Sequence, residues 1–227
     1  MSLGSRAEGL PLRVDEALRG RLALGLMEAE GLAGAPLPAG FDADAASVTD
    51  ALRARHAEHP VTDVPGVAET RALFHALGVD PTKTRPSSEA LLRRVLKGEG
   101  LPRVHPAVDV CNLCSLERQI PLGLYDRDQV HGPIVVRLGR PGEGYAGIRK
   151  QRVNLEGRLL LADDEGAFGA PTSDSARTAV SEGTRALVVV LFCPLARAAQ
   201  LGAALEGIAA RLDRWCGATT IAVRTVQ

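Results

Sequence analysis

The sequence predicts an α+β fold, and three features of its pattern indicate this class. Helical periodicity dominates much of the first half of the chain, whereas residues 132–169 contain short apolar runs separated by glycines. The most apolar run, "LVVVLFC" at 187–193, predicts a buried strand, and a helical pattern at 194–215 and a strand at 219–226 follow it. That order permits a right-handed crossover. Because 45% of the 227 residues are apolar, the chain can bury one sizeable core, and we expect a single domain over 1–227.

The N-terminal third is expected to contribute one strand and two helices. Residues 1–9, which open with "MSLGS", are interpreted as a tag or a disordered leader. A short extended start near residue 10 precedes the first strand, and the Pro- and Gly-rich "LAGAPLPAGFDAD" predicts a loop. The elements expected here are a strand at 21–28 and helices at 44–57 and 65–78.

The stretch "TRPSSEALLRRVLKGEG" gives the clearest helix signal. Ser87 or Ser88 can cap the helix N-terminus, where the first backbone N–H groups lack partners. Glu89 in the first turn and Lys97 in the last turn, just before Gly98, complement the helix dipole. The sequence therefore predicts a helix that begins at these serines and ends at this lysine.

A second helix and several strands follow. A proline opens the helix predicted at 106–119, since proline is well tolerated in the first helical turn. "GPIVVRLG" at 132–139 and "GRLLLADDEGAFG" at 157–169 predict strands, the second run with a turn at 164–166.

Helix 106–119 is apolar on nearly all sides, so we expect it to be buried. Asp109, Asn112 and Ser115 recur at every third position and form one slanted polar stripe. Buried polar side chains need hydrogen-bond partners or a water-filled cavity. The stripe is therefore interpreted either as a set of bonds to neighbouring loops or as the wall of a pocket.

The four cysteines predict reduced thiols packed as small apolar residues. Cys111 and Cys114 are three positions apart, but the repeated C-x-x-C spacing of a structural zinc site is absent from the sequence. His105 and His131 lie in turns and are weak candidates for zinc ligands. Metal or redox chemistry is kept as a minor alternative, and we expect no metal and no cofactor.

The charge balance argues against a nucleic-acid protein with a global basic field. Lys plus Arg and Asp plus Glu number 27 each, so an RNA partner would have to be bound by a local patch, and no DNA partner is expected. Two basic clusters are candidates either for solvated surfaces or for a phosphate-binding track. Their members are Arg93, Arg94, Lys97 and Arg103, and Arg149, Lys150 and Arg152. Without a membrane-length apolar run or a secretory leader, a cytoplasmic protein is expected.

The segment from "RPSSEALLRRVLKGEG" through "VDVCNLC" to "YDRDQVHG", at 85–132, resembles the free-standing B3/B4 domain proteins. These are relatives of the editing module in the β subunit of phenylalanyl-tRNA synthetase, and a looser resemblance continues to 193. The resemblance implies a three-layer α+β fold and, in the synthetase, hydrolysis of a tRNA that carries tyrosine in place of phenylalanine. Val108, Asp109 and Asn112 match a V-D-x-x-N frame on the helix beside the editing pocket.

The sequence departs from the synthetase pattern at two places and from that of the free-standing relatives at a third. Gly123 stands where the synthetase usually has a histidine, and the strand at 187–193 lacks the glutamate that ends its counterpart. The free-standing relatives also tend to carry a glycine at the first of these places. Their Arg- and Trp-rich segment corresponds to "GAPTSDSARTAV" at 169–180, which holds only Arg177.

Two functions are therefore carried forward. The first is a tRNA-binding, editing-type module that hydrolyses mischarged aminoacyl-tRNA in trans; the second is a non-catalytic RNA-binding or amino-acid-binding protein with the same fold. Hydrolysis of an activated ester needs a positioned water and oxyanion donors more than a strong nucleophile. The candidates for the substrate pocket are Asn112, Ser115, Gly123, Tyr125, Ser173, Asp174, Ser175 and Arg177. Asp109 and Asp126 are expected to be structural, and His105 is interpreted as a turn residue rather than a base.

Overall fold

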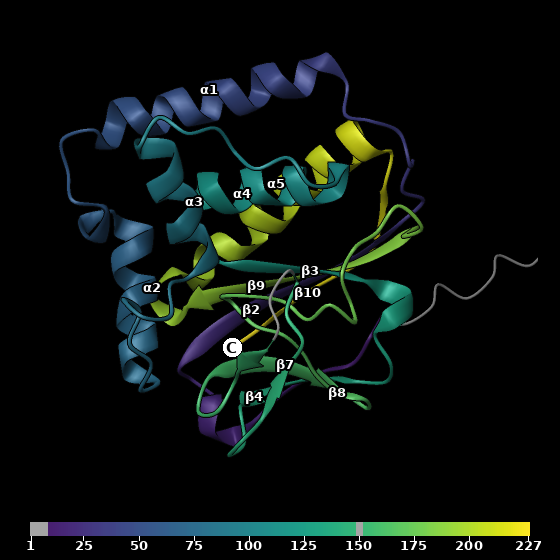
Figure 1. The fold of residues 1–227 in the computed structure, drawn as a ribbon. Helices are drawn as coiled ribbons and strands as arrows, with labels where there is room; N and C mark the ends of the chain where they lie inside the picture. The colour runs from purple at the N-terminus through teal and green to yellow at the C-terminus, as the bar shows by residue number, and fades with distance from the viewer. Residues whose placement is uncertain (1–8, 149–151) are drawn as a thin grey trace, which may run out of the picture.

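The computed structural model describes residues 9–148 and 152–227, which are arranged in three layers (Figure 1). Helices cover one face of a four-stranded sheet, and a second four-stranded sheet lies against the other face. The expected α+β, three-layer architecture is confirmed. Nearly all of the leader expected at 1–9 falls outside the described residues.

The elements follow one another along the chain without a repeat of any unit. The α-helices are α1 Ala39–His56, α2 Pro65–Ala76, α3 Ser87–Leu96, α4 Pro106–Arg118 and α5 Leu201–Cys216. The strands are β1 Leu12–Val14, β2 Leu22–Glu30, β3 Leu122–Asp126, β4 Ile134–Leu138, β5 Gly144–Tyr145, β6 Val153–Asn154, β7 Leu159–Asp163, β8 Gly166–Gly169, β9 Ala186–Pro194 and β10 Thr219–Val226.

The middle sheet has the strand order β10-β2-β9-β3, and all its neighbours are antiparallel. Since β9 and β10 each run antiparallel to β2, they are parallel to one another with β2 between them. The helix α5 joins them, so the expected strand–helix–strand unit is present, but an N-terminal strand is inserted into it. The N-terminal third therefore supplies a central strand of this sheet.

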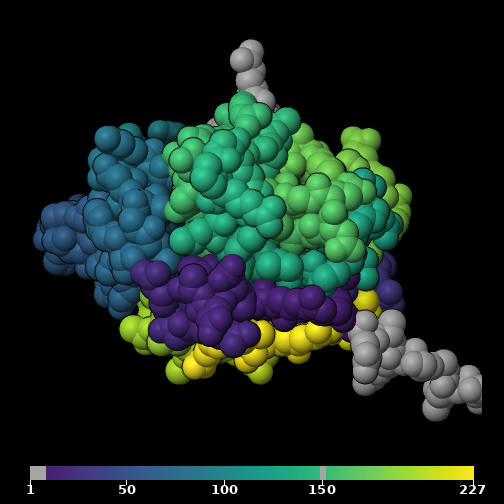
Figure 2. Space-filling view, turned by 90° about the horizontal axis from the view of Figure 1, so that it is seen from below, coloured from purple at the N-terminus to yellow at the C-terminus, as the bar shows by residue number. Residues whose placement is uncertain are grey.

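The outer sheet has the order β1-β4-β7-β8, in which β1 pairs parallel with β4 and the rest are antiparallel. β7 and β8 form the hairpin expected at 157–169. Seen from below, the purple N-terminal segment lies between the teal and green segments and the yellow C-terminal strand (Figure 2). The N-terminal and C-terminal segments of the described chain therefore lie side by side, and Arg224 Nη1 donates to Leu10 O at 2.9 Å.

Two cores lie on the two faces of the middle sheet. Along β9, Leu187 and Val189 face the helices, whereas Val188 and Val190 face the outer sheet. All four side chains are fully buried, which explains the uninterrupted apolar run in the sequence. Each such side chain stabilises the fold by about 1.5–3 kcal/mol through loss of contact with water.

Three local expectations at helix starts were wrong, and each concerns a proline. The helix expected at 194–215 begins as α5 only at Leu201, because Pro194 ends β9 and a 3-10 helix occupies Leu195–Gln200. α1 begins at Ala39, five positions before the expected start, because the Pro38 carbonyl accepts a bond from Phe41 N at 2.9 Å and opens the helix. α3 is not capped by a serine side chain: Pro86 occupies the N-cap position, and Ser87 N donates to Pro171 O at 3.0 Å. A carbonyl from a distant loop therefore satisfies the first amide of α3.

Helix α4 is buried, as its all-round apolar pattern predicts. It begins after His105, whose Nδ1 accepts a bond from Ala107 N at 3.3 Å, and it ends at Gln119, which has a positive φ of 51°. Burial lowers the pKa of His105, so the imidazole favours its neutral form. α4 lies against α5 and leads into β3, which was not recognised as a strand in the sequence.

Candidate substrate cavity and basic groove

A cavity of about 260 Å³ lies between α4, β3 and the loop that follows β8. Asn112 lines it, at the position expected from the polar stripe, but the walls are mostly apolar rather than polar. The lining residues are Val104, Val108, Cys111, Asn112, Leu122, Leu124, Ile148, Asp174, Ala179 and Val180. Asn112 and Asp174 are the polar groups of this wall, apart from the Cys111 thiol.

Two exposed apolar side chains border the cavity. Val104 is 52% exposed and Ile148 is 42% exposed, although both are large hydrophobic residues. Ile148 N donates to Asp174 O at 3.2 Å, which fixes the loop that carries Ile148 beside the loop that carries Asp174. The cavity therefore opens to solvent between apolar residues, a property suited to an apolar group of a ligand.

Asp109 holds one side of this opening in place. Its Oδ1 accepts a bond from Val104 N at 2.8 Å, and its Oδ2 lies 3.6 Å from Arg103 Nη1. Arg103 also pairs with Asp42 of α1 and packs 4.8 Å over the Phe41 ring. Burial raises the pKa of Asp109, while its bond to Val104 N opposes that shift. The first residue of the stripe thus ties α1 to the cavity opening.

Asp174 connects the cavity to the core between the sheets. Its Oδ1 accepts a bond from the Tyr125 hydroxyl at 2.8 Å and a longer one from Ala170 N at 3.4 Å. Burial raises the pKa of this carboxyl to about 7 and the pKa of the Tyr125 hydroxyl well above its ordinary value. Tyr145 donates its hydroxyl to Ser173 O in the same loop.

The Tyr125 ring explains the glycine at position 123. A Cβ on Gly123 would lie 1.8 Å from the Tyr125 hydroxyl oxygen, and a Cβ on Gly169 would lie 2.2 Å from the same atom. The ring also packs edge-on against Phe168 with centroids 4.9 Å apart. Neither Gly123 nor Tyr125 lines the cavity, so a side chain at 123 is excluded by packing on the face turned away from it.

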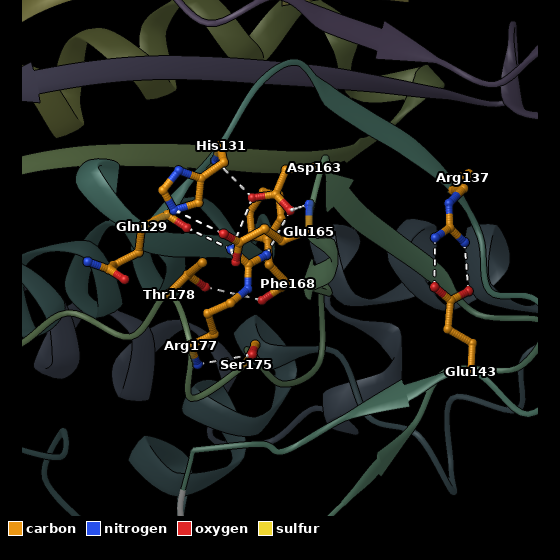
Figure 3. Close-up of polar contacts among 10 residues, drawn as sticks. All are labelled: Gln129, His131, Arg137, Glu143, Asp163, Glu165, Phe168, Ser175, Arg177 and Thr178. Carbon is orange, nitrogen blue, oxygen red and sulfur yellow. Dashed lines mark hydrogen bonds and ion pairs between the residues drawn. The ribbon is translucent and has the colours of Figure 1, made fainter.

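Arg177 does not line the cavity and points toward the carboxylates of Asp163 and Glu165 at the β7–β8 turn (Figure 3). Its Nη2 donates to Asp163 Oδ1 at 2.8 Å, and its Nη1 donates to Gln129 O at 2.8 Å. Glu165 adds a third acceptor at 3.3 Å. These bonds fix the loop that follows β8, and they occupy the one arginine that the sequence offers there.

Three further candidates bond backbone or neighbouring groups. Ser115 is buried and donates its hydroxyl to Ile120 O at 2.8 Å. Ser175 Oγ accepts from Arg177 N at 3.1 Å. Asp126 accepts from Asp128 N at 3.0 Å and from the Thr184 hydroxyl at 2.6 Å, which places it at the start of a short 3-10 turn.

A second hollow, a groove of about 600 Å³, lies along α3 and is bordered by four basic side chains. Its lining residues are Arg85, Ser87, Ala90, Leu91, Arg93, Arg94, Lys97, Glu99, Pro102, Asn112 and Thr172. Asn112 is common to the groove and to the apolar cavity. The sequence did not indicate that Asn112 of α4 lies beside the basic residues of α3, because the two helices meet only through tertiary packing.

The basic residues of the groove differ in their ion pairs. Arg93 Nε bonds the buried Glu89 at 2.8 Å, and Arg71 approaches the same carboxylate at 3.1 Å. Arg94 pairs with Glu99 at 2.8 Å on the surface. Within residues 9–148 and 152–227, Lys97 makes no ion pair.

The second predicted basic cluster is only partly visible. Arg149 and Lys150 lie outside the described residues. Arg152 donates to Gly142 O at 2.9 Å and is not among the residues that line the groove. Arg103 borders a separate hollow of about 350 Å³ under α1 instead of the groove.

The cysteines are free and buried. Burial raises the pKa of the Cys114 thiol to about 11 and that of Cys111 well above its ordinary value, so both favour the protonated form. In the described part of the chain, no group of three His, Cys, Asp or Glu side chains could hold a metal ion. None of the described helices is long and apolar enough to span a bilayer.

A family model of the B3/4 domain matches residues 69–202, more than half of the sequence and most of the lining of both hollows. The chain belongs to the B3/4 domain family. Phenylalanine–tRNA ligase beta subunits are among its curated relatives. The subunit from Nocardia farcinica is 35% identical over 128 residues, and that from Psychrobacter arcticus is 35% identical over 113 residues. These matches cover 55% and 48% of this chain.

The B3/4 chain spans a small part of those relatives, 15% of the first subunit and 14% of the second. A solved N-terminal fragment of the phenylalanyl-tRNA synthetase beta subunit from Pyrococcus horikoshii superposes with a TM-score of 0.51. It covers 97% of this chain and 55% of the fragment at 14% identity, which establishes a common fold. The resemblance expected from 85–132 is thereby confirmed at the level of family and fold.

Proposed function

We propose that this B3/4 protein binds aminoacyl-tRNA and hydrolyses a mischarged aminoacyl ester in trans. The supporting observation is the position of Asn112, which lines both the apolar cavity and the basic groove. An aminoacyl-tRNA has matching parts, because its phosphates are anionic and many amino-acid side chains are apolar. In this arrangement the ester between them lies beside Asn112.

The groove would bind the 3′ end of the tRNA through phosphate contacts. Arg85, Arg94 and Lys97 place positive charge in its lining. Such contacts provide affinity without base specificity and weaken as salt increases. A local patch of this kind is compatible with a sequence whose overall formal charge is zero.

The cavity would select the amino acid and orient its ester. The carboxamide of Asn112 can donate a hydrogen bond to the carbonyl oxygen and so stabilise the oxyanion that develops on attack by water. Because an aminoacyl ester is already activated, positioning a water beside it is sufficient for substantial acceleration. A strong nucleophile is not required by this mechanism.

The test is a panel of tRNAs, each charged with one cognate or one noncognate amino acid. Purified protein is added at catalytic concentration, and loss of the ester is followed over time against the spontaneous rate. The proposal predicts faster deacylation of a subset of noncognate pairs and little effect on cognate pairs. Equal rates with and without protein for every pair, despite saturating protein, would rule out the hydrolase.

The second candidate is a non-catalytic RNA-binding or amino-acid-binding protein. Its support is the engagement of polar groups elsewhere, with Ser115 bonded to a backbone carbonyl and Arg177 bonded to carboxylates. In the same panel, this candidate predicts salt-sensitive tRNA binding without deacylation. Either outcome would concern a tRNA or synthetase-related partner, which is the class that the beta-subunit relatives suggest.

A further inference from the structure

Asp174 is an acidic group in a cavity whose walls are otherwise mostly apolar. It lies in the loop after β8 and lines the cavity together with Asn112 of α4. One carboxyl oxygen, Oδ1, accepts bonds from the Tyr125 hydroxyl and Ala170 N. Among the described residues, Oδ2 has no hydrogen-bond partner.

Two described arginines of the neighbouring segments, Arg177 and Arg127, are bonded to other carboxylates. Arg177 is bound to Asp163 and Glu165 at the β7–β8 turn, as Figure 3 shows. Arg127 is bound to the buried Glu28 at 3.0 Å. Within 9–148 and 152–227, no lysine, arginine or histidine forms an ion pair with Asp174. A carboxylate in a mostly apolar cavity without a cationic partner is poorly stabilised, and a bound cation would compensate it.

We propose that Asp174 binds the α-ammonium group of an aminoacyl ligand, while the apolar side chain of that amino acid occupies the rest of the cavity. This inference rests on the proposed function and adds the recognition element for the amino acid. The ligand class is an amino acid with a free α-amino group and an apolar side chain. N-blocked amino acids and α-hydroxy acids are excluded as good ligands.

The surrounding geometry favours this assignment over a structural role alone. The titratable groups near the carboxyl are Tyr125 and Tyr145 of the strands beside it and Cys111 on the cavity wall, and all three are neutral at pH 7. Burial raises the Asp174 pKa to about 7, because the charged form loses contact with water. The Tyr125 hydroxyl and Ala170 N both bond Oδ1, so neither of them occupies Oδ2.

The experiment compares two hydrolysis-resistant probes that differ at one group. One is the leucine amide of 3′-amino-3′-deoxyadenosine; the other is its α-hydroxy acid counterpart, in which a neutral hydroxyl replaces the ammonium. Kd is measured by calorimetry for the wild-type protein, Asp174→Asn and Asp164→Asn. Asp174→Asn keeps an acceptor for Tyr125, so folding is retained, and thermal unfolding checks this. Asp164, on the exposed β7–β8 turn, provides the same chemical change away from the cavity.

The wild-type protein and Asp164→Asn should bind the amine about ten- to a hundredfold more tightly than the hydroxy probe, as expected for one charge-assisted hydrogen bond. Asp174→Asn should lose this preference and change little toward the hydroxy probe. If the wild-type protein acts on aminoacyl-tRNA but binds both probes equally or neither of them, the inference is wrong and the proposed function stands. If no aminoacyl-tRNA is bound or hydrolysed, the proposed function fails, and the inference fails with it.

Discussion

Among single residues, Asn112 differs from the other members of its stripe. Asp109 and Ser115 bond backbone groups, at Val104 N and Ile120 O. Asn112 has no hydrogen-bond partner among the described residues and lines both hollows. The threefold spacing thus places three polar side chains on one slanted line, and only the middle one remains available to a ligand.

Asn112→Ala should lower ester hydrolysis by roughly ten- to a thousandfold, because it removes one positioned donor from the reacting carbonyl. Its thermal unfolding should change little. Ser115→Ala is the matched control: it leaves a buried carbonyl unpaired and should reduce stability by about 1–2 kcal/mol without changing the rate per folded molecule. Both quantities can be measured on the substrate identified by the tRNA panel. Full activity of Asn112→Ala would contradict the assignment.

Gly123→Ala should reduce the free energy of unfolding by about 1–3 kcal/mol, because the new methyl group overlaps the Tyr125 ring in a packed core. Gly202→Ala serves as the control, since a Cβ there meets no atom within 4 Å and the site is in helix α5. That control should be neutral or slightly stabilising. Urea titration of the two variants measures the difference, and equal midpoints would show that the Tyr125 ring moves aside freely.

The roles of some of these residues could be predicted from the sequence, and those of others could not. The stripe on α4 follows from helix geometry and could be predicted from spacing alone. The reason for Gly123 could not, because it depends on the rotamer of Tyr125 and on Gly169, which comes from another sheet. The apolar opening formed by Val104 and Ile148 was missed for the same reason: these residues lie in loops far apart in the sequence.

Among the elements, helix α3 carries two kinds of charged residue: some form a buried ion-pair cluster, and others lie on the surface beside the groove. Glu89 is buried and is contacted by Arg71, Arg85 and Arg93, so this cluster fixes α3 to its neighbours. Removing Arg93 weakens that cluster, whereas Lys97 borders the groove without a described ion pair. Similar basic side chains on one helix therefore have different expected roles.

Lys97→Ala and Arg94→Ala should weaken tRNA binding and reduce the slope of log K against log salt by about one unit per lost phosphate contact. Arg93→Ala should chiefly lower the thermal unfolding temperature. Arg55→Ala, an equal charge change on the exposed face of α1, should leave the slope unchanged. Filter binding over a range of salt concentrations measures the slope. An unchanged slope for Lys97→Ala and Arg94→Ala would remove the groove from the RNA interface.

The elements predicted to within two residues of their observed bounds include those with strong local signals. β9 is an apolar run, and α2 begins at a proline, so local sequence determines both. The start of α1 and the cap of α3 were wrong because prolines and a distant carbonyl replaced the expected side-chain bonds. β3 has a glycine at its centre, which weakens a strand signal, and its pairing with β9 compensates for this.

For the whole molecule, the order of strands in the middle sheet determines which part of the chain can fold as an isolated fragment. The family match begins at residue 69, after β2, and ends at 202, before β10. β2 lies between β9 and β10 and contributes to both cores. The sequence indicated the fold class, but it carried no sign that an N-terminal strand would lie between two C-terminal ones.

A fragment of residues 69–202 should therefore fail to fold, since it exposes the apolar faces that β2 covers. Residues 9–227 should unfold cooperatively. Far-UV circular dichroism during heating and binding of a hydrophobic dye distinguish the two, with dye binding expected for the short fragment only. A separate peptide of residues 9–31, which contains β2, is added as a control: it should reduce dye binding if loss of β2 is the cause. Cooperative unfolding of the isolated fragment would show that the family region is an independent folding unit.

The position of β2 also affects how the protein is made. Leu22 of β2 pairs with Pro194 of β9, which the ribosome adds 172 residues later. At typical rates of synthesis, the interval is on the order of ten to thirty seconds. During that time a strand with eight buried positions in the native state has no partner and is open to association with other nascent chains. Protection of β2 from such association is accordingly needed until β9 has been synthesised, before either hollow exists.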